Sequence, residues 1–348
     1  MSKGLLGGPR PLQAVAGCIA EMGKLGFPFK CQDPFLFCVY HKDKFPPSTG
    51  KLRKGNGADF DWSQDYRMYH GEDLSGFPQH PHRGFETVTA TIQGFVDHTD
   101  SMGNAGRYGQ GDLQWMTAGA GVVHGEMFPL VYADKPNETK FFQIWLNLPR
   151  ANKMAPPMYT MHWFEQIPKV VSPDGLAELT LWAGKHDGKE GLPPPPHSYG
   201  SNSSSDLAIW FLKLLPGGSF TIPPAQNGRQ TNRNLYWTEG ELLSVGDQSV
   251  SEHCVMTLLA DQRALIRNPS TTVTSELLML QGKPIGEPVV QHGPFVMNTA
   301  AEIEQAFRDY RATQFGGWPW PEDAMSFPAS KGRFTLQNGK EEQPPTQP

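Results

Sequence analysis

The sequence predicts an all-β protein built from many short strands and turns. Glycine and proline account for 37 and 32 of the 348 residues, nearly a fifth together, while long runs rich in Ala, Glu, Lys and Leu are scarce. Short runs with strand-like apolar patterns alternate with glycine turns over residues 30–150 and return after residue 176. At roughly 150 residues per domain, this length indicates two domains or one large two-layer fold.

The run FETVTATIQG at 85–94 carries the clearest strand signal. Val88, Ala90 and Ile92 fall on one side of an extended chain, and the threonines of the same run fall on the other. Gly94 ends the run. The second half contains comparable runs, among them DLAIWFLKLL and HCVMTLLAD, and is therefore also predicted to be β-rich.

One helix is predicted, over residues 299–313. Thr299 and Glu302 have the spacing of a capping box, in which each side chain satisfies a backbone N–H at the start of a helix. The apolar residues from Ile303 to Tyr310 recur at helical intervals. The helix is therefore expected to be amphipathic.

Three segments have compositions that do not bury a core. Residues 46–61 are rich in glycine and charge and are interpreted as a loop inserted before the main sheet. Residues 184–206 combine a four-proline run with a serine tract and are expected to be mobile. Residues 326–348 are polar and contain prolines, and are expected to form a disordered tail.

Composition excludes several classes of protein. With 30 basic and 35 acidic side chains, the chain lacks the positive excess of a nucleic-acid-binding surface, so direct nucleic-acid binding is not expected. Four cysteines without a Cys-x-x-Cys pair argue against a disulfide scaffold or a zinc ribbon. The start lacks a signal peptide, and no segment approaches the roughly 18 apolar residues of a membrane span. We therefore expect a cytoplasmic protein without membrane association. Whether it also enters the nucleus stays open.

Two pairs of residues have the spacing of metal ligands. His80 and His82 are two positions apart in GFPQHPHRGFETVT, and His124 and Glu126 have the same spacing in GAGVVHGEMFP. Residues i and i+2 of a strand project on one side, so two such strands can converge on one ion as a three-histidine, one-carboxylate site with room for exogenous ligands. A His-x-His motif is more often a surface or hydrogen-bonded pair, and at this point both interpretations stay open.

The other histidines have no second pair of potential ligands at this spacing, and none is assigned to a metal. They are His41, His70, His98, His162, His186, His197, His253 and His292. The segment at 119–121 resembles the start of a dinucleotide-binding motif, but His124 stands at its third glycine position and no helix follows. A nucleotide site is therefore not predicted.

At these residues the sequence resembles the pirin family of the bicupin fold. The matching segments are DPFLF at 33–37, HPHRGFETVT at 80–89, GDLQWMTAGAGVVHGE at 111–126, FQIWLNL at 142–148 and GPFVMNT at 293–299. The resemblance implies two tandem cupin-type β-barrels with a C-terminal helix, and one Fe(II) per chain in the first barrel. It also implies that this iron is bound by the residues matching His80, His82, His124 and Glu126.

The resemblance suggests the following division of the chain. The metal-binding cupin domain is expected at 30–150 and a second cupin domain at 160–295, followed by the helix at 299–313 and the tail. In the second domain Gln226, Gly228 and Asn232 stand where the first has His80, His82 and Glu86. We therefore expect the second domain to be metal-free.

Glu86 is a point of conflict between two patterns. The general cupin pattern His-x-His-x-x-x-Glu would make it a ligand, whereas the pirin family uses the later His-x-Glu pair. The resemblance therefore implies that Glu86 lies outside the ligand set, where a carboxylate can orient an imidazole.

The activity that the resemblance implies is that of a quercetin 2,3-dioxygenase-like oxidoreductase. It would use Fe(II) and O2 on a flavonol-like aromatic substrate, because imidazoles and one carboxylate suit Fe(II) and leave positions open. Glu126 is the expected catalytic residue, since a carboxylate beside the metal can take the substrate's hydroxyl proton. The alternative is a non-enzymatic, iron-binding, redox-sensitive regulator of transcription or signalling complexes, with protein partners.

Overall fold

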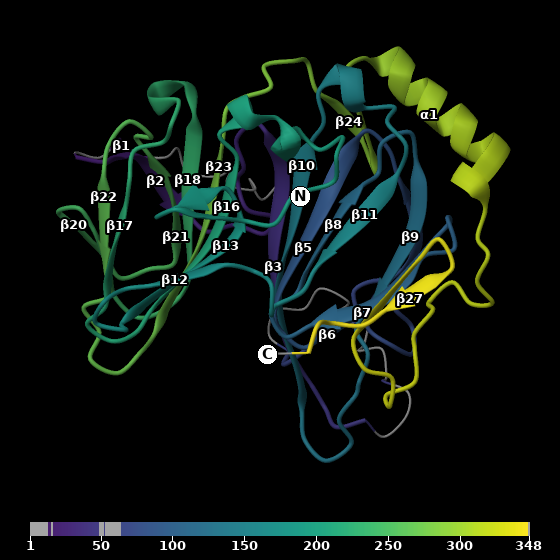
Figure 1. Ribbon diagram of the computed structural model, residues 1–348, viewed down its shortest axis with the longest axis horizontal. Coiled ribbons are helices and arrows are strands. Elements are labelled where there is room, and N and C mark those ends of the chain that lie inside the picture. Colours follow the sequence, from purple (N-terminus) through teal and green to yellow (C-terminus); the bar gives the residue numbers. More distant parts are fainter. Residues whose placement is uncertain (1–12, 15–16, 49–51, 53–63, 347–348) are drawn as a thin grey trace, which may run out of the picture. The chain divides into compact units, whose positions relative to one another are not determined.

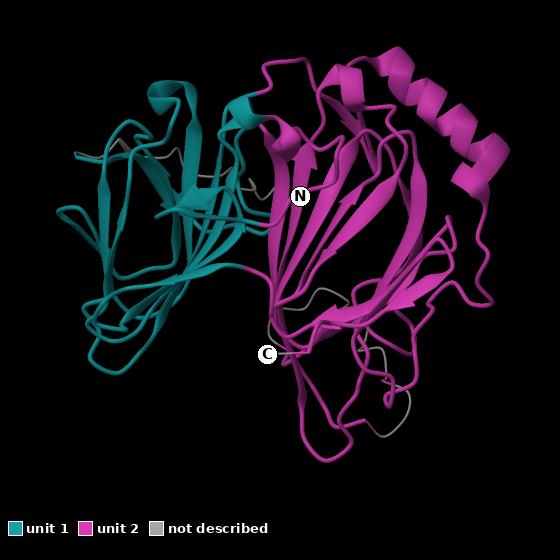
Figure 2. Cartoon of the chain, viewed as in Figure 1, with its two compact units in different colours: residues 1–33, 168–191, 203–284 teal, residues 34–167, 192–202, 285–348 magenta. Residues whose placement is uncertain are grey.

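The computed structural model describes residues 13–14, 17–48, 52 and 64–346 (Figure 1). In this part of the chain β-strands dominate and α1, Ala300–Thr313, is the single α-helix, which confirms the predicted fold class. The chain forms two compact units (Figure 2). Unit 1 comprises residues 1–33, 168–191 and 203–284, and unit 2 comprises residues 34–167, 192–202 and 285–348. None of the helices in the described ranges has the length and apolar character needed to cross a membrane.

Unit 2 contains two large antiparallel sheets. The five-stranded sheet has the order β11-β8-β5-β10-β3 and the six-stranded sheet the order β27-β26-β7-β6-β9-β4. Their bounds are β3 Phe35–Phe45, β4 Gly76–His82, β5 Phe85–Gln93, β6 Phe95–Asp100, β7 Ala105–Gly109, β8 Leu113–Thr117, β9 Val122–Met127, β10 Asn137–Asn147, β11 Met158–His162, β26 Phe334–Gln337 and β27 Lys340–Glu342. A hairpin of β24, Val290–His292, and β25, Phe295–Met297, completes the strands. Buried aromatic side chains from both sheets, including Tyr108 and Phe141, form a shared core.

Unit 1 is also built from two main antiparallel sheets. Their strand orders are β1-β2-β21-β18-β23-β16-β13-β12 and β17-β22-β19-β20, and β14 and β15 form a separate hairpin. The bounds are β1 Gln13–Ala14, β2 Ile19–Lys24, β12 Lys169–Val171, β13 Ala177–Ala183, β14 Lys185–His186, β15 Lys189–Glu190, β16 Ala208–Leu214, β17 Ser219–Ile222, β18 Asn232–Glu239, β19 Leu243–Val245, β20 Gln248–Val250, β21 Cys254–Leu258, β22 Ala264–Arg267 and β23 Ser275–Gly282. Alternate side chains of these strands meet in one apolar cluster that includes Leu181, Trp237 and Ile266.

The bounds of the units differ from the predicted domains. The strand β2 pairs with β21 and so belongs to unit 1, although it precedes the whole metal-binding domain in sequence. Residues 192–202 and 285–295 belong to unit 2, whereas the prediction assigned both to the second domain. Strand pairing joins distant segments, and a local apolar pattern does not identify which sheet edge a strand will join.

The expectation of a disordered tail at 326–348 is wrong for the described residues. The strand β26 pairs with β7 and β27 pairs with β26, and Phe334 is buried. The neighbouring strand supplies backbone hydrogen bonds that the composition of the tail could not reveal.

The proline- and serine-rich segment also differs from the expectation of a mobile loop. It contains the 3₁₀ helices η2, Tyr199–Ser201, and η3, Ser203–Ser205, and Ser198 and Tyr199 are buried. The other predicted loop, 46–61, lies largely outside the described residues.

The helix α1 begins as the capping box predicts. The side chain of Thr299 accepts a hydrogen bond from the backbone N–H of Glu302, while Glu302 Oε2 accepts one from the N–H of Asn298. Its buried residues, Ile303 and Ala306, pack in a cluster with the hairpin residue Phe295. The helix thus belongs to unit 2, together with the strands that were predicted to form the first domain.

Candidate metal centre

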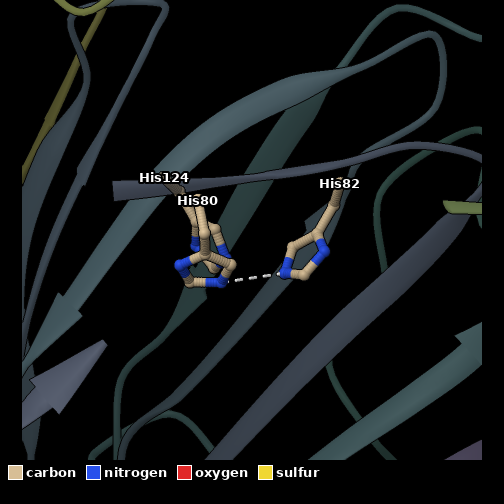
Figure 3. Close-up of side chains that lie close together, drawn as sticks. All are labelled: His80, His82 and His124. Carbon is tan, nitrogen blue, oxygen red and sulfur yellow. Dashed lines mark hydrogen bonds between the residues drawn. The ribbon is translucent and has the colours of Figure 1, made fainter. Parts of the chain in front are cut away.

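Three of the four predicted ligands come together in unit 2. The ligand nitrogens of His80, His82 and His124 all lie within 4.8 Å of one another. Figure 3 shows the contact between the Nε2 atoms of His80 and His82, which are 3.1 Å apart. The ring of His124 lies beside that of His80, with 4.5 Å between their centroids.

The pairing of two strands produces this cluster. His80 and His82 stand two positions apart on β4, so their side chains project on the same side of the strand. In the antiparallel pair of β4 and β9, His124 stands directly opposite His80 and Val122 opposite His82. Directly opposed residues of neighbouring strands share a face of the sheet, which brings the third imidazole to the other two.

The turn after the two histidines is anchored on both sides. Gly84 has a φ of +86°, and a Cβ at this position would lie 2.0 Å from the carbonyl oxygen of Val296. Arg83 donates through Nη1 to Asp309 Oδ2 of α1 at 2.7 Å. The helix and a close backbone approach therefore hold the end of the ligand-bearing strand.

Burial keeps the three imidazoles neutral. Desolvation holds the pKa values of His82 and His124 well below their usual value and also lowers the pKa of His80. Nδ1 of His80 donates to the carbonyl oxygen of Pro78 at 2.9 Å, so Nε2, which faces His82, carries the lone pair. A neutral imidazole with an oriented ring is the form that binds a metal ion.

The cluster fits a metal cofactor. Both ring nitrogens of His124 are buried and have no hydrogen-bond partner among the described residues. Leaving a buried polar group unsatisfied costs about 1–3 kcal/mol, so such atoms normally have partners. Three neutral imidazoles converging on one point form a donor set suited to a first-row transition-metal ion, which would satisfy one nitrogen of each ring.

Glu126, the fourth predicted ligand, lies next to the cluster in its own hydrogen-bond network. Its Oε2 is 3.9 Å from His124 Nε2. Oε1 accepts a 3.0 Å hydrogen bond from Thr89 Oγ1, and Oε2 accepts a 2.9 Å hydrogen bond from Gln143 Nε2. The hydroxyl of Tyr108 lies 3.5 Å from Oε1. The carboxylate is thus held at the edge of the cluster by donors from the chain.

Sequence reasoning missed these neighbours of Glu126. Gln143 on β10 stands directly opposite Thr89 on β5. Polar side chains at facing positions of two strands that are otherwise buried indicate a polar site, and this pairing is the signal that could have identified them.

Glu86 does not orient an imidazole, which corrects the role expected for it. Oε1 accepts hydrogen bonds from Thr117 Oγ1 at 2.7 Å and Trp115 Nε1 at 3.2 Å, while Oε2 accepts one from Ser198 Oγ at 2.7 Å. Glu86 and Thr89 are three positions apart on β5, so they project on opposite faces. Because Thr89 faces Glu126, Glu86 faces away from the metal cluster.

His98, which the sequence analysis assigned to no metal, lies beside the cluster. It stands on β6 directly opposite Glu126 of β9, and its ring centroid is 5.6 Å from that of His124. Its Nε2 lies 3.3 Å from Asp100 Oδ2. His98 is therefore a neighbour of the cluster, although its nitrogens are not among those grouped within 4.8 Å.

The residues of the cluster differ in burial. His82, His124 and Glu126 are each 3% exposed or less, whereas His80 and the preceding residues from Phe77 are partly exposed. The partly exposed residues of β4 are therefore the part of the cluster nearest to solvent.

Comparisons with known proteins agree with this fold. Residues 30–146 match the Pirin family model and residues 209–316 match the model of the Pirin C-terminal cupin domain. A protein of Pseudomonas aeruginosa provisionally named quercetin 2,3-dioxygenase is 38% identical over 240 residues, covering 69% of this chain and 79% of that protein. A pirin-like protein of Solanum lycopersicum is 36% identical over 250 residues, covering 70% of this chain and 77% of that protein.

A solved structure shares the architecture. The crystal structure of quercetin 2,3-dioxygenase from Acinetobacter baumannii aligns with a TM-score of 0.67 and 30% identity, over 82% of this chain and 87% of that one. The two family models, the relatives and the histidine cluster all agree with the resemblance that the sequence suggested. This chain belongs to the pirin family, and its His80, His82 and His124 form a cluster that could hold a metal ion.

Proposed function

We propose that this protein is an Fe(II)-dependent dioxygenase that acts on a flavonol-like aromatic substrate. The observation that carries the proposal is the cluster of three neutral imidazoles with the Glu126 carboxylate beside it. Similarity to proteins named quercetin 2,3-dioxygenase supports the reaction class. In this proposal one ion is bound per chain.

The residues of the centre would divide the work as follows. His80, His82 and His124 would hold the ion, with Glu126 as the fourth ligand. Fe(II) in such a donor set supplies redox chemistry with dioxygen and leaves positions open to other ligands. The partly exposed side at His80 would admit the substrate, and the buried side would exclude water.

Glu126 would also act as the general base. A flavonol hydroxyl that enters past His80 would meet the carboxylate at the edge of the histidine cluster, where Oε2 lies 3.9 Å from His124 Nε2. Thr89 and Gln143 each donate one hydrogen bond to the carboxylate and keep it in place while it receives the proton. A positioned base of this kind contributes roughly 10²–10⁴-fold to a rate.

Oxygen uptake by metal-defined protein tests the proposal. Protein loaded with Fe(II) without oxygen and freed of excess metal is mixed with a panel of flavonols and catechols in aerated buffer. We expect oxygen consumption that requires both the flavonol and the bound iron. Absence of consumption with every compound, in protein whose iron content is measured, would contradict the proposal.

A further inference from the structure

The chain continues past the matched family regions with a segment that joins the metal-binding sheet. The match to the C-terminal cupin domain ends at residue 316, and we call residues 317–342 the C-terminal extension. Within it, β26 pairs with β7 and β27 pairs with β26. The extension therefore adds two strands to the sheet in which β4 and β9 carry the three histidines, as β27 in Figure 1 illustrates.

A buried ion pair of the sheet depends on the extension. Arg107 Nε and Nη2 donate to the two carboxylate oxygens of Asp97 at 2.6 and 2.7 Å, and both side chains are almost fully buried. The guanidinium also donates to the carbonyl oxygens of Phe327, Pro328 and Lys331. Asp97 accepts a further hydrogen bond from Ser326 Oγ at 2.7 Å. The extension thus supplies further hydrogen-bond partners to the buried charges of Arg107 and Asp97.

Two more contacts reach the backbone beside the ligands. The carbonyl oxygen of Asp323 accepts a 2.8 Å hydrogen bond from the N–H of Gln79, the residue before His80. Trp320 Nε1 donates to the carbonyl oxygen of Asp100 at 2.8 Å, and Asp100 stands directly opposite His124 in the pair of β6 and β9. The extension therefore contacts β4, which carries His80 and His82, and β6, which pairs with the strand that carries His124.

We propose that the C-terminal extension is a positioning element for the metal centre. It fixes the backbone at Gln79 and Asp100, so that the imidazoles of His80 and His124 remain at the separation that one ion requires. Outer contacts that orient ligands commonly change metal affinity, and coupling between two sites is reciprocal. Bound metal therefore also stabilises the extension. The proposal uses the metal site of the proposed function but neither its substrate nor its turnover.

A pair of matched variants measures this coupling. Trp320→Phe keeps the aromatic ring and removes the hydrogen bond to Asp100, whereas Trp318→Phe removes a hydrogen bond to the carbonyl oxygen of Glu322, within the extension itself. Affinities for Fe(II) without oxygen, and for redox-inert Zn(II), are measured by competition with a chelator. We expect Trp320→Phe to weaken metal binding by about 3- to 10-fold, the range of one net hydrogen bond, and Trp318→Phe to change it by less than about 2-fold.

Hydrogen exchange provides the reciprocal measurement. Backbone amides of residues 334–342 should exchange more slowly in metal-loaded than in metal-free wild-type protein, and this difference should disappear in His82→Ala. If Trp320→Phe does not fold, Ser326→Ala, which removes one hydrogen bond to Asp97, replaces it in the affinity measurement.

Two results would overturn the proposal. One is equal metal affinity in wild type, Trp318→Phe and Trp320→Phe; the other is exchange at 334–342 that is indifferent to metal. A variant that lowers thermal stability without changing affinity would mean that the extension only supports the fold. A protein that binds metal as described but consumes no oxygen would contradict the proposed function and leave this inference intact.

Discussion

Thr89 Oγ1 donates a 3.0 Å hydrogen bond to Glu126 Oε1, and both side chains are almost fully buried. Gln143, opposite Thr89 in the five-stranded sheet, donates to the other carboxylate oxygen at 2.9 Å. The three histidines come from the six-stranded sheet instead. Glu126 itself lies on the six-stranded sheet with the histidines, and two donors from the five-stranded sheet hold its carboxylate. Both sheets of unit 2 therefore fix the position of the carboxylate relative to the imidazoles.

Replacement of His82 by alanine should abolish tight metal binding. The variant removes one of three imidazoles that form the centre, so we expect a loss of more than the roughly 10- to 100-fold typical of residues that merely orient a ligand. Iron content after loading and washing, measured by elemental analysis, checks this. His253→Ala serves as the control, because His253 is exposed and its Nε2 lies 3.0 Å from the carbonyl oxygen of Gly240 in unit 1. Equal loss in both variants would contradict the assignment of the site.

The protein should bind one ion per chain. The histidine cluster of unit 2 is the group found in the described ranges that could hold a metal ion. At the corresponding positions of unit 1, Gly228 lies in the 3₁₀ helix η4, Gly228–Gln230, and Asn232 Nδ2 donates to the carbonyl oxygen of Asp33. Elemental analysis of saturated and washed protein should give one equivalent. A second tightly bound ion that survives the loss of His80 would contradict the expectation of a metal-free second cupin domain.

Glu86 should make stability depend on pH. Burial raises its pKa from 4.5 to about 7, against four hydrogen-bond donors that favour the charged form. Between pH 4.5 and 7 the folded protein therefore holds a proton that the unfolded chain has released, so the free energy of unfolding falls as pH rises through this window. A shift of this size corresponds to about 3 kcal/mol, with the contribution fully present below pH 4.5 and lost above pH 7.

Urea unfolding from pH 4.5 to 7.5 measures this effect. Glu86→Gln retains the acceptor for Trp115 and Thr117 but does not titrate, so the free energy of unfolding of wild type should fall by about 3 kcal/mol relative to that of the variant as pH rises across the window. Glu138→Gln, a change at an exposed carboxylate, is the control and should leave the wild-type pH profile unchanged. Parallel profiles for wild type and Glu86→Gln would show that Glu86 stays charged in the folded protein.

The features that the sequence predicted well are those encoded by local periodicity. The period of two along β4 and β9 predicted that His80, His82 and His124 come together, and the capping-box spacing predicted the start of α1, because both signals lie within a few residues. The side of each strand that faces the core was harder to predict. The strand β5 is buried from Phe85 to Thr91 on both faces, and its threonine face, not its apolar face, turns to Glu126.

The features that could not be predicted depend on partners far away in sequence. Ser198 lies in a segment whose composition predicts mobility, yet it is buried and donates to Glu86, 112 positions earlier. The tail gains order from its pairing with β7 and its contacts with Arg107. In both cases the partner supplies hydrogen bonds that compensate for the conformational entropy lost, and no local pattern identifies that partner.

Replacement of Glu126 by glutamine distinguishes an enzyme from a regulator. Glu126→Gln keeps the size of the side chain and one oxygen acceptor for Thr89, but it removes the charge and the basicity. The variant should bind iron more weakly than wild type but should still be filled with iron when the metal is in excess. If the carboxylate is both ligand and base, the iron-loaded variant should lose flavonol turnover by roughly 10²–10⁴-fold.

The measurement is oxygen uptake per bound iron in wild type and variant, with iron content determined on the same samples. The rate per bound iron distinguishes the loss of the general base from the loss of metal. A variant that merely binds less iron would keep the wild-type rate per ion. A regulator would behave differently: wild type would consume no oxygen with any flavonol, and binding of a protein partner would follow the oxidation state of the iron. Undiminished turnover in iron-loaded Glu126→Gln would refute the catalytic role and indicate another base, or a substrate that arrives already deprotonated.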